Sequence, residues 1–458
     1  MLSTALWIND APVNAPSLLS AIPFAILLLC IALLPLFHGT HHWWERNSNK
    51  LLISVVLGLF TLLYYQFRQT GYLHNDHLSE PGFPAVLAVL YVALLNDYVP
   101  FMAMLFSLYT ISGGIRWDIR MKPTPLVNAT LLLVGTLLAS FIGTTGASML
   151  LIRPVIEINQ HRKHKLHTIL FFIFLVANIG GSLLPLGDPP LFIGYLRGVP
   201  FLWTLALVPH WACCAVLLLI IYFIWDTLVF RREVLPEVDL APHADGRTRR
   251  SFEVSGRINY LWLAGVVFSL ALLLPGKPFL GTNWIVPVYF REAMMLLFTA
   301  LSWFTTPHGV RDKNQFNFTA IGEVAFLFIG VFICMLPPLE ILQVRGNELG
   351  LTEPWQFFWT TGILSSFLDN APTYAIFFET ALSLQPGTKI PADPLLIALS
   401  VGAVFMGANT YIGNGPNFMV KSIAEGAGIK MPSFFGYMLY SVTILIPIFV
   451  LLTFLFFR

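Results

Sequence analysis

Long apolar runs separated by short polar stretches make up most of the chain, and they predict membrane-crossing helices. The first run, residues 17–37, has no basic segment before it, which favours a retained membrane helix over a cleaved signal peptide. The pattern predicts an all-α polytopic membrane protein with about ten transmembrane crossings and two re-entrant hairpins. The other runs lie at residues 51–65, 84–110, 125–158, 167–186, 200–230, 258–274, 289–304, 320–336, 355–384, 394–406 and 431–457.

Two of these runs are interrupted, and two others are followed, by residues that a continuous helix disfavours. Residues 143–146 read G-T-T-G, and residues 366–373 read S-F-L-D-N-A-P-T. At each of these two places we expect a hairpin of two half-helices that meet at a tip. Residues 187–190 read G-D-P-P, and residues 407–417 read G-A-N-T-Y-I-G-N-G-P-N. These two stretches predict discontinuous helices, which membranes tolerate where protein or a water-filled cavity surrounds the unwound backbone.

A single offset relates the two halves of the chain. When the sequence is shifted by 226 residues, S-F-I-G-T-T-G-A falls on S-F-L-D-N-A-P-T, and Gly187 falls on Gly413. The same shift places Asp97 on Glu323. The chain therefore reads as a duplicated unit of acid-bearing helix, hairpin, broken helix and closing helix. The expected organisation is scaffold helices at residues 1–83, repeat 1 at 84–230, a linker at 231–257, scaffold helices at 258–319 and repeat 2 at 320–458.

The distribution of positive charge predicts the orientation of these repeats. Most of the 26 Lys and Arg residues fall in segments that share one side of this topology, including the linker at residues 231–257. Because such a bias marks the cytoplasmic side, we expect both termini outside and the two repeats inverted. Secondary transporters of this plan hold substrate and coupling ions at discontinuous helices near the midplane of the membrane. We expect the protein to lie in a bacterial inner membrane.

Composition supports a membrane protein and argues against other classes. Hydrophobic residues make up 56% of the chain and charged residues only 11%, whereas soluble proteins have about 25% charged residues. No basic block is interleaved with aromatic residues, so no nucleic-acid partner is expected. No H-E-x-x-H, G-x-S-x-G or Ser/His/Asp grouping indicates an enzyme. The expected partners are the lipid bilayer and, through the scaffold at residues 258–304, a second copy of the chain.

The motifs together resemble those of the ion transporter superfamily. The resemblance rests on S-F-L-D-N-A-P-T, on A-N-I-G-G-S-L-L-P-L-G-D-P-P at residues 177–190 and on the stretch at residues 407–417, and it covers both repeats. That superfamily includes NhaD-type sodium/proton antiporters, arsenite permeases and citrate or dicarboxylate carriers. G-E-V-A-F-L-F-I-G at residues 322–330 is similar to the acid-bearing helix of the antiporter branch. The serine-asparagine-threonine hairpin signatures of the dicarboxylate branch are missing, so the resemblance implies sodium/proton exchange.

The candidate chemistry is that of a cation site. Sodium, like other hard cations, prefers carboxylate, amide and carbonyl oxygens, and Asp369 and Asn370 place the first two at one hairpin tip. We therefore expect Na⁺ at these residues, no cofactor, and Na⁺ and H⁺ as coupling ions. Arg153 is assigned as a structural counter-ion and as the membrane-embedded cation near the tips. The candidate ion- or substrate-binding residues are Asp369, Asn370, Thr373, Thr144, Thr145, Asn178, Asn409, Thr410 and Asn414, and the candidate proton carriers are Asp97, Glu323, Asp369 and Asp188.

Two functions follow from these assignments. The first is a Na⁺/H⁺ antiporter that exports Na⁺ or Li⁺ in exchange for protons by alternating access, with a small inorganic cation as substrate. The alternative is a cation-coupled transporter of citrate or a related carboxylate from the same superfamily. An anion carrier would need fixed positive charge or free donors at the tips, and these are scarce in the sequence.

Each candidate residue also has a structural alternative. Asp369 could cap a helix at the break, and Asp188 lies in a turn sequence that favours Asp. Asp97 and Glu323 could pair with Arg153. The remaining alternatives are helix-break amides for Asn178 and Asn409, and solvated loop residues for His161, His164 and His167.

Overall fold

The computed structural model describes residues 7–8, 16–35, 37–74, 77–233, 252–385 and 387–458, and these form an all-α polytopic membrane protein with a few short strands. The chain divides into two compact units. Unit 1 comprises residues 1–102, 193–199 and 317–403. Its elements are β1 (Trp7–Ile8), η2 (Leu18–Ala21), α1 (Ile22–Leu33), α2 (His38–Trp44), α3 (Asn47–Phe67), β2 (Leu73–His74), β3 (His77–Ser79), α4 (Phe83–Leu90), the π-helix η3 (Tyr91–Tyr98), α13 (Thr319–Cys334), α14 (Leu336–Arg345), η7 (Gly346–Leu349), α15 (Pro354–Phe367) and α16 (Asn370–Ser383).

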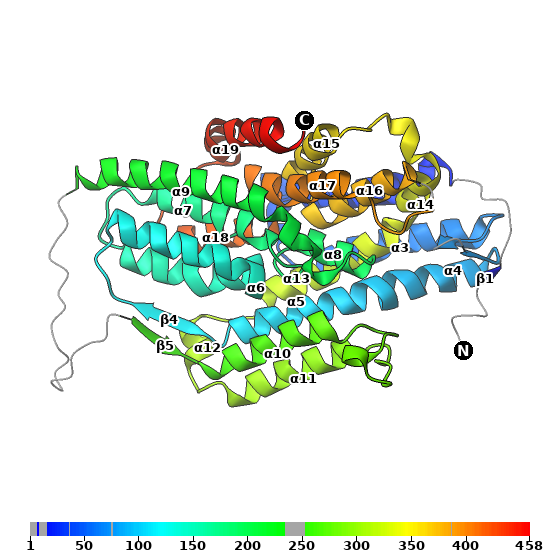
Figure 1. Ribbon diagram of the computed structural model, residues 1–458, viewed down its shortest axis with the longest axis horizontal. Coiled ribbons are helices and arrows are strands. Elements are labelled where there is room, and N and C mark those ends of the chain that lie inside the picture. Colours follow the sequence, from blue (N-terminus) through cyan, green and yellow to red (C-terminus); the bar gives the residue numbers. More distant parts are fainter. Residues whose placement is uncertain (1–6, 9–15, 36, 75–76, 234–251, 386) are drawn as a thin grey trace. The chain divides into compact units, whose positions relative to one another are not determined.

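Unit 2 comprises residues 103–192, 200–316 and 404–458. Three of the five boundaries between the units fall inside helices, namely α5 (Val99–Ser112), α8 (Pro189–Leu196) and α17 (Asp393–Met406). Within unit 2, α10 (Ile258–Leu272) and α11 (Phe290–Thr305) lie side by side (Figure 1). Its elements are β4 (Arg116–Ile119), α6 (Pro125–Ile158), α7 (Leu166–Leu175), η4 (Ile179–Ser182), η5 (Phe201–Leu207), α9 (Val208–Phe230), β5 (Phe252–Ser255), α10 (Ile258–Leu272), η6 (Phe279–Gly281), α11 (Phe290–Thr305), α12 (Val310–Lys313), η8 (Gly407–Asn409), α18 (Gly415–Gly426) and α19 (Phe434–Phe456).

Helix length and apolar surface identify the membrane-spanning parts. Among the described residues, five helices are long and apolar enough to cross a bilayer, and the bent pair α13–α14 makes up to six. Their outer faces expose large apolar side chains such as Phe60 of α3 and Leu439 of α19. Such faces would be unstable in water but suit lipid, so the chain is an integral, multi-pass membrane protein.

The helix α6 is a hairpin, although it is one of the five by length. Gly143, with φ 77° and ψ 152°, interrupts its 34 residues. On either side, Asn128 and Asn159 exchange two hydrogen bonds of 2.9 Å although they are 31 residues apart. In a straight helix that separation would be about 46 Å. The predicted break in G-T-T-G is therefore a reversal of the chain, and its two arms pack together.

Gly143→Ala is expected to destabilise this tip. The backbone at Gly143 lies in a region that is essentially restricted to glycine, so an Ala there should cost about 1–3 kcal/mol. Thermal unfolding in detergent measures the loss. Gly426→Ala is the matched control, because an added Cβ at Gly426 meets nothing within 4 Å. An unchanged melting temperature for Gly143→Ala would contradict a tip whose backbone conformation requires glycine.

A second hairpin forms where S-F-L-D-N-A-P-T predicted it. Glu353 and Gln356 form a capping box that begins α15, and Pro354 occupies its first turn. The helix ends before Leu368, which is extended, and α16 starts at Asn370. Phe357 and Phe377 lie on the two arms with their ring centroids 6.4 Å apart. The two helices therefore double back on each other.

Both predicted discontinuous helices are also present. In the first, α7 ends at Leu175, the short η4 follows, and α8 begins only at Pro189. In the second, α17 ends at Met406, η8 follows, and α18 begins at Gly415. The Gly, Asn and Pro residues between the halves explain the unwinding, because they disfavour a continued helix.

Some elements differ from the expectation. The first apolar run is helical only to Leu33, and the polar stretch after it forms α2. Short strands also went unrecognised: β3 pairs with both β1 and β2, and β4 pairs with β5 in an antiparallel ribbon. The β1–β3 and β4–β5 pairs join distant segments, which local patterns do not encode, whereas β2 and β3 are neighbours in sequence. Most of the predicted linker, at residues 234–251, lies outside the described residues.

Candidate functional site

A buried carboxylate joins the first hairpin to both discontinuous helices in unit 2. Asp188 precedes α8 and is only 1% exposed. Its Oδ1 accepts hydrogen bonds from Thr144 Oγ1 at 2.9 Å and from Asn414 Nδ2 at 3.1 Å. The hairpin tip is fixed further by the backbone, since Thr144 N donates to the carbonyl of Gly187 at 2.8 Å. Three broken elements therefore meet at Asp188.

Buried amides extend this cluster. Asn178 Nδ2 donates to Asn417 Oδ1 at 2.7 Å, and Asn414 Nδ2 lies 3.3 Å from Asn178 Oδ1. Asn417 Nδ2 in turn donates to the carbonyls of Gly407 and Thr410 at 2.8 and 2.9 Å. These bonds satisfy carbonyls that unwinding takes out of the helices, a requirement away from water. The amides therefore hold the two discontinuous helices together.

Two glycines allow the backbones to approach at this point. A Cβ on Gly181 would lie 2.7 Å from Thr144 Cγ2 and 2.9 Å from the Gly187 carbonyl. A Cβ on Gly187 would lie 2.1 Å from the Gly181 carbonyl. Neither position has room for a side chain, which explains the glycines beside the acid.

The cluster combines two kinds of electrostatic feature. Its carboxylate, amide and carbonyl oxygens are ligands of the kind that a hard cation prefers. The second arm of α6 and the helices α8 and α18 also begin here, at Thr144, Pro189 and Gly415. Helix N-termini carry partial positive charge and favour anions. The arrangement can hold a cation on its oxygens and orient an anion with its helix ends.

The other predicted residues of unit 2 lie along the same segments. Thr145, next to the tip, is half-buried. Thr410 is fully buried, and its Oγ1 accepts from the backbone N–H groups of Ile412 and Gly413 at 3.2 and 3.1 Å. The carbonyl of half-buried Asn409 accepts from Ser441 Oγ at 2.7 Å. Thr410 therefore braces the turn between the helix halves.

In unit 1, Asp369 caps α16. Its Oδ1 accepts from the backbone N–H of Ala371 at 3.1 Å, which is the structural role considered for it. Its carbonyl accepts from Thr373 Oγ1 at 2.9 Å. Asn370 and Thr373 are fully buried beside it. The tip thus places a half-buried carboxylate, an amide and a hydroxyl within one turn of chain.

The two acids equated by the repeat lie on different kinds of helix. Asp97 is half-buried in the π-helix η3, three residues before Pro100, and the helix continues into α5. Wide π turns of this kind recur at functional sites. Glu323 is 43% exposed and pairs with Lys50 at 2.7 Å. Arg153, considered as the partner of these acids, donates to Gln315 Oε1 at 3.2 Å.

Several buried charges were missed by sequence reasoning, and Arg153 is not the only embedded cation. Arg68 Nη1 pairs with Glu340 Oε2 at 2.7 Å, and both side chains are buried. Arg197 pairs with Glu379 of α16. Glu379 lies in the same apolar run as Asp369, a signal that could have identified it. Arg68 gave no such signal, because it follows a helix end and resembles a loop residue.

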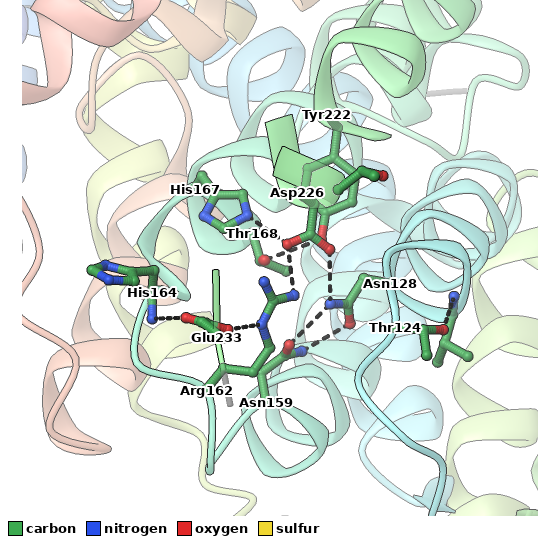
Figure 2. Close-up of polar contacts among 12 residues, drawn as sticks. Thr124, Asn128, Asn159, Arg162, His164, His167, Thr168, Tyr222, Asp226 and Glu233 are labelled. Carbon is green, nitrogen blue, oxygen red and sulfur yellow. Dashed lines mark hydrogen bonds and ion pairs between the residues drawn. The ribbon is translucent and has the colours of Figure 1, made fainter. Parts of the chain in front are cut away.

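A buried polar cluster in unit 2 was also missed. Asp226 of α9 accepts from His167 Nε2 at 2.8 Å and pairs with Arg162 Nη1 at 2.6 Å (Figure 2). His167 is only 4% exposed, so the expectation that it is solvated was wrong. The apolar residues around it in α7 are buried as well, because this helix packs inside unit 2.

Comparison with known proteins assigns the chain to a family. A family model described as "Putative citrate transport" matches residues 13–457. The chain belongs to this family. The match agrees with the resemblance to the ion transporter superfamily, which includes citrate carriers.

Curated relatives match over shorter segments. The P protein of Sus scrofa is 38% identical over 81 residues, 17% of this chain. The P protein of Mus musculus is 38% identical over 126 residues, 24% of this chain. The matched segments cover only 10% and 15% of these relatives.

Proposed function

We propose that the protein is a secondary active transporter that moves citrate or a related small carboxylate together with a cation. The observation that carries the proposal is the family match over residues 13–457. It favours the carboxylate over Na⁺/H⁺ antiport, the first of the two functions considered from the sequence. The motif argument against carboxylates rested on missing hairpin signatures, and helix N-termini offer another way to bind an anion.

The geometry of unit 2 supports this coupling. Asp188 with its amide and carbonyl neighbours supplies oxygens for Na⁺, or a carboxylate that can carry a proton. The helix ends at Thr144, Pro189 and Gly415 supply the positive potential that a carboxylate substrate needs. A cation bound to the oxygens would add to that potential, so each ligand favours binding of the other.

Contacts within each unit support the duplicated plan. Asp188 and Asn414 are 226 residues apart, the offset that superimposes the repeats, and they are hydrogen bonded. Tyr98 OH donates to the carbonyl of Ala325, which is 227 residues away. Residues near a two-fold axis contact their own equivalents or the neighbours of these, and the two pairs are contacts of these two kinds. We propose two inverted repeats, with both termini outside and in a bacterial inner membrane.

Uptake into proteoliposomes tests the proposal. Purified protein should accumulate labelled citrate above its outside concentration when an inward Na⁺ or proton gradient is imposed, and this accumulation should stop when both gradients are dissipated. Asp188→Asn vesicles of equal protein content serve as the inactive control. Accumulation of citrate above its outside concentration without either gradient would contradict coupling.

Na⁺/H⁺ antiport is the second candidate. Asp369 and Asn370 share one tip of the second hairpin, and a carboxylate beside an amide suits competition between Na⁺ and a proton. In that case Na⁺ or Li⁺ added outside should collapse an imposed proton gradient in vesicles without any organic anion. A gradient that persists until citrate is added would exclude this candidate.

A further inference from the structure

A basic cavity of about 370 Å³ opens in unit 2, beside the cluster around Asp226. Lys163, Lys165 and Lys430 line it together with His164, and Lys165 Nζ donates to the carbonyl of Gln160 at 2.9 Å. Lys163 and Lys430 are exposed, and Lys165 is half-buried. No acidic side chain is among the described residues that line the cavity. Its lining therefore favours an anion.

The remaining wall of the cavity is apolar and aromatic. Leu170 and Ile429 contribute to it, and Trp225 stacks between His167 and Tyr440 with ring centroids 5.6 and 6.4 Å away. Trp225 belongs to α9 and Tyr440 to α19, and both helices expose large apolar residues to the surroundings. Trp and Tyr are enriched where membrane proteins meet lipid headgroups. The cavity thus links a basic loop to lipid-facing helices.

The buried cluster holds the basic loop in place. Arg162 immediately precedes Lys163 and is 2% exposed, paired with Asp226 and, through Nε, with Glu233 Oε2 at 2.9 Å (Figure 2). Glu233 Oε1 also accepts from the backbone N–H of His164 at 2.6 Å. The carboxylates of Asp226 and Glu233 are thereby engaged by Arg162, His167 and this N–H group. Lys163 and Lys165 therefore lie on an ordered loop, which lowers the entropy lost on binding. Lys430 lies on another segment, between α18 and α19.

We propose that this cavity binds the phosphate headgroup of an anionic phospholipid, with an acyl chain along the aromatic wall. Lys ammonium groups are point charges that suit phosphate, and basic pockets at the ends of membrane helices bind such headgroups. The apolar wall favours a lipid over free phosphate, because free phosphate would gain nothing from Leu170, Trp225 and Ile429. The inference is independent of the transported substrate.

Lipid titration of the full-length protein in detergent tests this site. Phosphatidylglycerol should raise the melting temperature and remain bound in native mass spectra, whereas phosphatidylcholine and inorganic phosphate should do neither. The triple variant Lys163→Gln, Lys165→Gln and Lys430→Gln should need a roughly hundredfold higher phosphatidylglycerol concentration, since each Lys near an anionic lipid contributes about 1 kcal/mol. Each shift in melting temperature is measured against the same variant without lipid. A change in the variant's stability without lipid therefore does not affect the comparison.

A second triple variant controls for total charge. Lys122→Gln, Lys277→Gln and Lys389→Gln remove the same charge from exposed positions that do not line the cavity, and should leave the titration unchanged. Equal weakening in both triple variants would overturn the site in favour of diffuse attraction. The same melting shift with inorganic phosphate would replace the lipid by free phosphate. If the first triple variant retains the lipid at the phosphatidylglycerol concentration that half-saturates the unmodified protein, the proposal is overturned.

Discussion

Asp188→Asn is expected to reduce cation-coupled substrate flux by roughly a hundredfold or more, while the protein stays folded. The change removes the buried charge but keeps an oxygen that can accept from Thr144 and Asn414. A cation or proton would then lose its carboxylate partner. Most of the hydrogen bonds between the first hairpin and the two discontinuous helices would remain. Flux into proteoliposomes and thermal unfolding in detergent measure the two effects separately.

An exchange of side chains makes the test sharper. Asp188 and Asn414 are separated by the offset of 226 residues that aligns the two halves of the sequence, and they are hydrogen bonded at 3.1 Å. The double variant Asp188→Asn with Asn414→Asp moves the carboxylate to the other partner and preserves the charge of the pair. We expect it to recover part of the lost flux. If the double variant folds but is as inactive as Asp188→Asn, the carboxylate is needed at position 188 itself. A negative charge at either residue of the pair would then not be enough.

Asp369→Asn is expected to cause a loss of similar size through the second hairpin. Asn caps helices about as well as Asp, so this variant keeps the bond from Ala371 N and removes only the charge. Asp369→Ala removes both, and should also destabilise the protein by about 0.5–2 kcal/mol. Flux and melting temperature of the two variants therefore separate the charge from the cap.

The control for this pair is another helix cap. Ser433 caps α19 through a bond from Gly436 N at 3.2 Å, and Ser433→Ala should lower stability without abolishing flux. If Asp369→Asn transports like the unmodified protein, Asp369 is a cap alone. The cation site would then rest on the residues around Asp188.

The breaks in the helices could be predicted because their causes are local. Gly143, Pro189 and Gly415 act on the backbone within one turn, so hairpins and discontinuous helices were visible in the sequence. The offset of 226 residues even equated Asp188 with Asn414. That these two residues touch could not be predicted, because an alignment of repeats gives no distance between them.

The buried ion pairs could not be predicted for a different reason. Arg68 and Arg162 lie just beyond helix ends, where Arg usually faces water, and only packing brings Glu340 and Asp226 to them. Their partners are 272 and 64 residues away in sequence. The choice of partner is a property of the tertiary fold, so patterns of apolar and polar residues do not contain it.

The coupling of carboxylate and cation is tested most directly by a citrate gradient that drives a cation. Vesicles loaded with citrate and placed in citrate-free medium, with equal Na⁺ and pH on both sides, should export Na⁺ or protons together with citrate and build a cation gradient. Asp188→Asn vesicles should build none. Citrate efflux without cation movement, or Na⁺ and protons exchanging in opposite directions without citrate, would contradict the account.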